Sequence, residues 1–180
     1  MENLSSGLRR LNALPHSSAE NEFLKCCGSK SWAVQMTKER PFTNVAELTE
    51  AADRIWWQLS PADWLEAFRS HPKIGEKKPE QQTAAAALSW SGKEQAGVTD
   101  APADTLAALA DLNRRYEEKF GFIYIVCATG KSSAELLAIL RERLTNERDT
   151  ELRTAANEQA KITRLRLHKL IDSLEGQTQG

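Results

Sequence analysis

The chain has 180 residues, 41% of them hydrophobic, and balances 24 lysines and arginines against 25 aspartates and glutamates for a net charge of −1. This length and apolar content predict one globular domain, and the balanced charge provides no basic stripe of the kind that binds nucleic acid. The longest notable apolar run, FGFIYIVCA, is far shorter than the ~18 residues needed to span a membrane, so we expect no membrane segment.

The amino-terminal half of the sequence contains several residues that typically begin or end a helix. Ser17 and Glu20 have the spacing of a capping box ahead of AENEFLKCC, and Gly28 ends that segment. The next predicted helix, SWAVQMTKER, ends at Pro41. The strongly amphipathic stretch NVAELTEAADRIWWQL follows, and Ser60 then caps another helix.

The carboxyl-terminal half continues in the same way. The alanine-rich stretch PEQQTAAAALSWSGKEQAG predicts a helix, and leucines three residues apart mark another that Gly121 closes. Ser132 with Glu135 opens AELLAILRERL, and a long final helix runs from about 150 to 174. Only FIYIVCA, at 122–128, resembles a strand. Since no second strand can pair with it, we interpret it as a buried extended segment or as a helix overridden by tertiary packing.

These signals predict an all-α fold, a single bundle-like domain of about seven or eight helices. We expect this domain to span residues 17–175, with a flexible segment at 1–16 and a flexible tail at 176–180. The three cysteines have neither disulfide-framework nor zinc spacing, which indicates a reducing compartment. The start MENLSSGLRR is unlike a secretory signal and the end TQG is unlike the SKL-type peroxisomal address, so we expect a cytoplasmic protein.

His71 stands between an aromatic-rich helix pattern and Pro72, in the stretch FRSHPKIGEKKPE. The residue before a proline is pushed out of the α region, so the preceding helix is expected to end at or before His71. A helix carboxyl end favours the protonated imidazole. The position fits either a histidine that only interacts with the helix end or an acid–base group. No metal-ligand spacing surrounds any of the three histidines, so we predict no metal site.

A polar cluster occurs in SGKEQ, at residues 91–95. On a helix, Ser91, Glu94 and Gln95 are at i, i+3 and i+4 and project from one face. Glu and Gln are mostly exposed in proteins, which favours a solvated surface. The neighbouring alanines make close packing of this face an alternative.

Arg166 interrupts the apolar face of the final helix. At 3.6 residues per turn it lies one turn from Ile162 and one turn from Leu170, both apolar, whereas Arg164 lies nearer the edge of that face. A charged side chain on an inward face is costly unless it is paired or binds a ligand. Arg166 fits a structural ion pair or a snorkelling side chain on the one hand, and a guanidinium that receives a substrate carboxylate on the other.

Four motifs occur in order: WLEAFRSHPKIGEK, SGKEQAG, LADLNRRYEEKFGFIYIVCATGKS and AKITRLRLHKL. Together they resemble the OHCU decarboxylase family, which acts on 2-oxo-4-hydroxy-4-carboxy-5-ureidoimidazoline in the pathway from urate to allantoin. The resemblance runs from about Phe23 to Leu174. CCGSKSWAVQM and WLEAF are most similar to the plant-type branch, in which this domain is often fused to a transthyretin-like hydrolase. The interval from His71 to Glu94 is a few residues longer than in some relatives, which concerns the turn at 76–82.

The resemblance implies an all-α homodimer that converts a small-molecule substrate to (S)-allantoin without metal or organic cofactor, with hydroxyisourate hydrolase as a pathway partner. It implies that His71, Glu94 and Arg166 are catalytic. The residues matched to substrate binding are Pro72, Ser91, Gly92, Lys93, Gln95, Tyr124, Ile125, Val126, Cys127 and Ala128.

Two other kinds of function remain open. One is a non-catalytic helical interaction module that retains the fold, against which the presence of His71, Glu94 and Arg166 argues. The other is a hydrolase of a related ureido compound, for which the sequence contains no metal-ligand spacing and no nucleophile motif.

Overall fold

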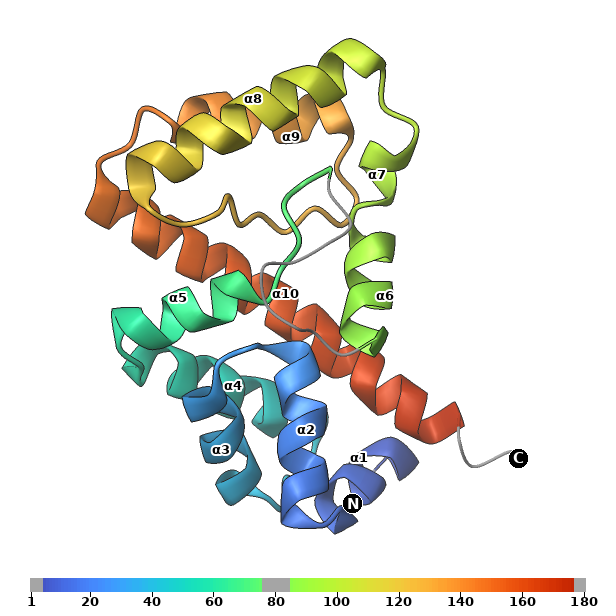
Figure 1. Ribbon diagram of the computed structural model, residues 1–180. Coiled ribbons are helices and arrows are strands. Elements are labelled where there is room, and N and C mark those ends of the chain that lie inside the picture. The colour runs from blue at the N-terminus through green and yellow to red at the C-terminus, as the bar shows by residue number, and fades with distance from the viewer. Residues whose placement is uncertain (1–4, 76–84, 177–180) are drawn as a thin grey trace. The chain divides into compact units, whose positions relative to one another are not determined.

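The computed structural model describes residues 5–75 and 85–176, and the turn expected at 76–82 lies outside them. Regular structure in the described residues is helical, with no β-strand, which confirms the predicted all-α fold (Figure 1). The helices of this part of the chain are α1 (Ser6–Ala13), α2 (His16–Cys26), α3 (Lys30–Glu39), α4 (Val45–Gln58), α5 (Pro61–Arg69), α6 (Ala85–Glu94), α7 (Ala96–Thr99), α8 (Ala103–Phe120), α9 (Ser133–Arg143) and α10 (Arg148–Gly176).

The chain divides into two compact units. The terminal unit consists of Met1–Trp64 with Ala160–Gly180, and the central unit consists of Leu65–Gln159. Helices α5 and α10 each contribute residues to both units. Each unit contains buried apolar residues of its own.

In the terminal unit, α2, α3 and α4 pack in sequence order. Phe23 of α2 meets Trp32 of α3 edge to face, with ring centroids 5.9 Å apart, and it meets Phe42 in the same manner. The Trp32 indole N–H donates to the Ala52 carbonyl of α4 at 3.1 Å, so the buried indole keeps a hydrogen-bond partner. These aromatic contacts join the three helices into one core.

Helix α1 corrects the expectation of a flexible amino-terminal segment for residues 5–16, the part of 1–16 that the structure describes. Ser5 caps this helix by accepting a hydrogen bond from the Leu8 N–H, and Leu8 and Leu11 are fully buried. A Cβ on Gly7 would overlap the Ile171 carbonyl oxygen, so α1 lies closer to α10 than any other residue would permit. The sequence shows no long periodic run here, because the helix has only eight residues and depends on packing.

The capping box expected at Ser17 is wrong in position. Helix α2 begins at His16, and Pro15 occupies the N-cap without a side-chain hydrogen bond. Proline fixes φ near the value that starts a helix, so the helix begins before Ser17 can cap it. The capping box at Ser132 and Glu135 is confirmed in both directions at the start of α9.

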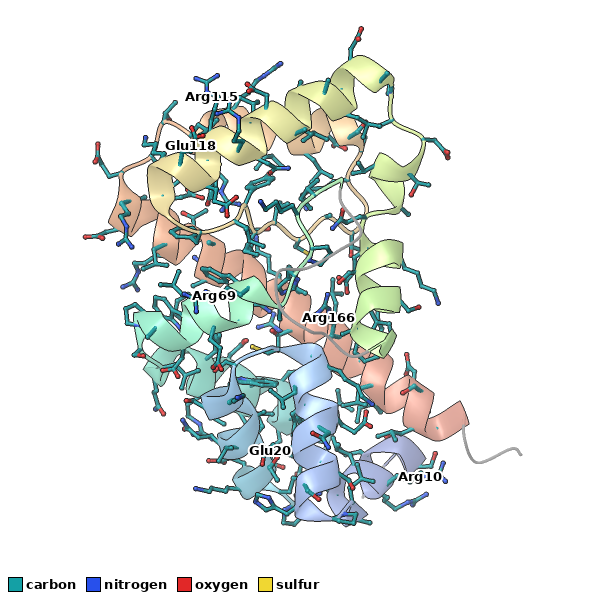
Figure 2. The ribbon with its side chains drawn as sticks, viewed as in Figure 1. Arg10, Glu20, Arg69, Arg115, Glu118 and Arg166 are labelled. Atoms are coloured by element: carbon teal, nitrogen blue, oxygen red, sulfur yellow. The ribbon has the colours of Figure 1, made fainter. Side chains whose placement is uncertain are left out.

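In the central unit, α8 and α9 pack against each other. Tyr116, Phe120 and Phe122 form an aromatic cluster with Phe68 and Tyr124, the closest pair being Tyr116 and Phe120 with centroids 4.6 Å apart. Arg115 and Glu118 project from the opposite, solvent-facing side of α8 (Figure 2). Gly121 ends α8 at φ 78°, as the sequence predicts, because a left-handed C-cap strongly favours glycine.

Candidate active site

His71 lies where the sequence places it, just beyond the end of α5. The N–H groups of Ser70 and His71 donate to the Ala67 and Phe68 carbonyls, both at 3.1 Å, and Pro72 then prevents the helix from continuing. The histidine is only 7% exposed. Its Nε2 lies 2.7 Å from Oε1 of Gln159, a side chain of α10 with no exposed surface. A helix end alone does not require a buried, hydrogen-bonded imidazole.

The loop after Pro72 is fixed by two amides from distant parts of the central unit. Asn113 of α8 donates its Nδ2–H to the Ile74 carbonyl at 3.0 Å, and Gln95 accepts the Gly75 N–H at 3.0 Å. Gly75 has φ 88°, a conformation that favours glycine. Gln95 therefore holds the backbone of the histidine loop, while its amide N–H groups remain donors.

The polar cluster of α6 is oriented as its helical spacing predicts. Ser91 and Glu94 are buried and Gln95 is half-buried, whereas Gly92 and Lys93 face solvent. This rules out a fully solvated face for the cluster. A Cβ on Gly97 would overlap the Lys131 carbonyl oxygen, so the short helix α7 can approach the segment after residue 128 only with glycine at this position.

The segment 123–128 is buried and is neither helix nor strand, which confirms the expectation of a buried segment without a sheet partner (Figure 1). Side chains bond its backbone in place of a neighbouring strand. Arg143 Nη1 donates to the Ile125 carbonyl at 2.6 Å, and Glu158 accepts the Cys127 N–H at 2.8 Å. Lys131 Nζ donates to the Cys127 carbonyl at 2.7 Å. These contacts hold the irregular backbone in place, and we call its residues 124–128 the wall.

Arg143 itself belongs to a buried polar network. Its guanidinium forms an ion pair with Glu151 at 2.5 Å, and the Tyr116 hydroxyl donates to the same carboxylate. Asn146 donates to the second Glu151 oxygen at 2.7 Å. Burial raises the pKa of the Tyr116 hydroxyl far above its usual range, with Arg143 opposing the shift, so this phenol stays protonated. The network connects α8, α9 and α10 to the wall at 124–128.

The Cys127 thiol is not an activated nucleophile. Burial raises its pKa, Lys131 opposes the shift, and the carboxylates of Glu158 and Glu94 add to it. The sulfur therefore remains a thiol at neutral pH. The same influences indicate that Glu94 and Glu158 both lie near this end of the wall.

Arg166 is buried as its helical phase predicts, with 2% of its surface exposed, and it lies in the terminal unit on α10 (Figure 2). Its Nη1 is 3.5 Å from the Lys25 carbonyl, and its charge lowers the pKa of the Cys26 thiol, which burial raises overall. Arg164, by contrast, is exposed and pairs with Asp53. His71, Ser91, Glu94, Gln95 and the 124–128 segment all belong to the central unit, whereas Arg166 belongs to the terminal unit.

Three side chains that hydrogen-bond residues of the candidate site were not predicted from the sequence: Gln159, Glu158 and Asn113. Glu158 is half-buried, and its carboxylate accepts the Cys127 N–H. Gln159 precedes Arg166 by seven residues, close to two turns, so it shares the helical phase that singled out the arginine. Asn113 stands between Leu109 and Tyr116 on the buried face of α8. The sequence signal that could have identified Gln159 and Asn113 is a polar residue at a position where helical periodicity predicts burial.

Within residues 5–75 and 85–176, no group of three or more His, Cys, Asp or Glu side chains is placed to hold a metal ion. None of the helices found there is both long and apolar enough to cross a membrane.

The chain is similar to proteins of urate degradation. The profile of the OHCU decarboxylase family matches residues 12–168. The uric acid degradation bifunctional protein TTL of Arabidopsis thaliana is 44% identical over 154 residues, which cover 84% of this chain and 47% of the relative. The 2-oxo-4-hydroxy-4-carboxy-5-ureidoimidazoline decarboxylase of Amia calva is 31% identical over 169 residues, covering 91% and 94%.

A crystal structure of OHCU decarboxylase in the presence of (S)-allantoin superposes with a TM-score of 0.72 at 40% identity, covering 84% of this chain and 98% of that one. The chain spans about half the length of the Arabidopsis relative and about a third of a bifunctional relative from Bacillus.

Proposed function

Because the chain belongs to the OHCU decarboxylase family, we propose that it decarboxylates 2-oxo-4-hydroxy-4-carboxy-5-ureidoimidazoline to (S)-allantoin without a cofactor. The observation that carries this proposal is the buried His71, whose ring is held at 2.7 Å by Gln159 in the same compact unit as Ser91, Glu94 and the 124–128 wall. An imidazole in such a setting suits proton transfer.

The substrate supplies its own electron sink. When the bond from the ring carbon to the carboxylate breaks, carbon dioxide leaves and the electron pair moves toward the neighbouring C=N bond. The ring nitrogen takes up a proton, and an enol remains. Loss of the hydroxyl proton and protonation of the carbon that bears the ureido group then give the ketone and the new stereocentre. The protein has to place the ring and move protons on one face.

Proton transfer and substrate binding fall to different residues of the site. His71 moves the proton between the hydroxyl oxygen and the ring carbon, and Glu94 balances the imidazolium that forms in between. Ser91, the Gln95 amide and the backbone of 124–128 bind the ureido group and the ring, with Pro72, Gly92 and Lys93 at the margin.

Arg166 receives the substrate carboxylate in this proposal, through the two parallel hydrogen bonds that a guanidinium can donate. Its burial on the inner face of α10 supports the role. We further propose a cytosolic homodimer that acts after hydroxyisourate hydrolase. The names of the longer, bifunctional relatives support a shared pathway.

A coupled assay tests the activity. Urate oxidase and hydroxyisourate hydrolase generate the unstable substrate from urate, and circular dichroism follows the chiral product with and without this protein. We expect faster formation of the S enantiomer, unaffected by chelators. A rate equal to the spontaneous one would leave the non-catalytic helical module as the better account, and loss of activity on chelation with recovery on adding zinc would contradict the cofactor-free route.

Glu94→Gln is expected to lower turnover roughly ten- to hundredfold, since a charge-assisted contact contributes about 1.5–3 kcal/mol. The amide keeps the shape of the carboxylate, so the melting temperature should change little. Steady-state kinetics and thermal unfolding check both points, with the exposed Glu142→Gln as matched control. Parental turnover with an unchanged pH profile would exclude Glu94 as the charge partner of His71.

A further inference from the structure

The ring of His71 has one hydrogen-bond partner that the mechanism above does not use. Gln159 reaches it from a position 88 residues further along the chain, and Nε2 and Oε1 are 2.7 Å apart, a short and well-defined bond. Gln159 has no exposed surface and His71 has 7%. Losing the bond would remove a partner from two buried polar side chains, which is costly, so the two side chains hold each other in place.

We propose that Gln159 is a positioning residue that keeps the His71 proton on Nε2 and thereby makes Nδ1 the nitrogen that exchanges a proton with the substrate. The second half of this inference rests on the proposed function. An amide oxygen can only accept, so the nitrogen facing Oε1 carries hydrogen. In the neutral ring the other nitrogen, Nδ1, then lacks a proton and is the base.

The support for Gln159 makes it suited to this role. It projects from α10, a helix whose neighbouring residue Glu158 accepts the Cys127 N–H at 2.8 Å. One short stretch of helix therefore fixes both the imidazole and the wall at 124–128. Groups placed by regular helices are held more accurately than groups placed by loops.

The choice of an amide rather than a carboxylate also has a chemical consequence. A carboxylate at Oε1 would favour the imidazolium and make the ring slower to release its proton. A neutral acceptor orients the ring without itself adding a charge that favours one protonation state. The chain has a glutamate at 158 and a glutamine at 159, so the ionised group bonds backbone and the neutral group bonds the histidine.

The test compares Gln159→Met, which keeps the length but removes the acceptor, with Gln159→Glu, which adds charge, and with Asn157→Met as a control at an exposed amide of the same helix. Nitrogen-15 chemical shifts of the His71 ring, assigned with a His71→Gln sample, report which nitrogen carries the proton in the full-length protein. Turnover, KM and pH profile are measured on the same samples.

We expect the parent ring to be protonated on Nε2 when neutral and Gln159→Met to lose that preference, with kcat roughly tenfold lower and KM little changed. Gln159→Glu should move the His71 titration and the matching limb of the pH profile upward by about one unit or more. Arg143, Glu94, Glu158 and Lys131, which are charged groups near the wall, are unchanged in every variant.

A parent ring protonated on Nδ1, or a Gln159→Met ring with the parental tautomer and turnover, overturns the inference. Should Gln159→Met fail to fold, the parent spectrum and Gln159→Glu still decide it. The spectra need no substrate, so an inactive parent enzyme would refute the proposed function while the ring tautomer still tests Gln159.

Discussion

Replacing His71 by glutamine is expected to lower turnover by roughly 10²–10⁴-fold, the usual loss when an acid–base group is removed. The amide nitrogen of glutamine reaches about as far as Nε2 of histidine and can still donate to Gln159, so the buried pair keeps its hydrogen bond. Backbone bonds from Ser70 and His71 to α5 do not involve the ring. The helix end should therefore remain as it is.

The measurement is turnover in the coupled assay together with thermal unfolding and allantoin binding on one sample. We expect the melting temperature to fall by no more than about 4 °C, equivalent to about 1 kcal/mol in a chain of this size. His168→Gln, at an exposed histidine of α10, is the matched control and should behave as the parent. If His71 served only to end a helix, its variant would melt early and keep full turnover.

Local signals predicted most of the helices and the orientation of the α6 cluster. Spacing alone put Ser91 and Glu94 on one face of α6, although residue type favoured a solvated face over the buried one observed, and it put Arg166 on the inner side of α10. Proline and glycine placed the ends of α5 and α8, because their backbone limits act within a few residues. These features depend on neighbours in sequence, so one chain is enough to infer them.

The rest depends on contacts between residues far apart in the chain. Gln159 becomes a partner of His71 only when two segments 88 residues apart meet, and Asn113 reaches Ile74 across 39 residues. Helical periodicity can predict that a polar residue is buried, but it cannot predict which distant residue will be its hydrogen-bond partner. Helix α1 was not predicted for a related reason. Gly7 is needed because Ile171, far away in the sequence, approaches it closely, and the burial of Leu8 is seen only in the folded protein.

Arg143→Met is expected to destabilise the protein more than the substitutions of His71, Glu94 or Gln159. It removes the cation from a carboxylate with no exposed surface, and breaking one side of a buried ion pair costs about 3–5 kcal/mol. Tyr116 and Asn146 would still bond Glu151, but neither carries a charge. The Ile125 carbonyl would lose its donor as well, so the wall at 124–128 should loosen.

Chemical denaturation of three variants separates these effects. Arg114→Met is the control, because Arg114 is exposed and pairs with Asp111 and Glu118 on the surface, where an ion pair contributes at most about 1 kcal/mol. The double variant Arg143→Met/Glu151→Leu should recover part of the loss, since it leaves no unpaired buried charge. If Arg143→Met cost no more than Arg114→Met, the network would not stabilise the central unit. If the double variant regained stability but not turnover, Arg143 would be needed to hold the wall, because two apolar side chains cannot replace its hydrogen bond to the Ile125 carbonyl.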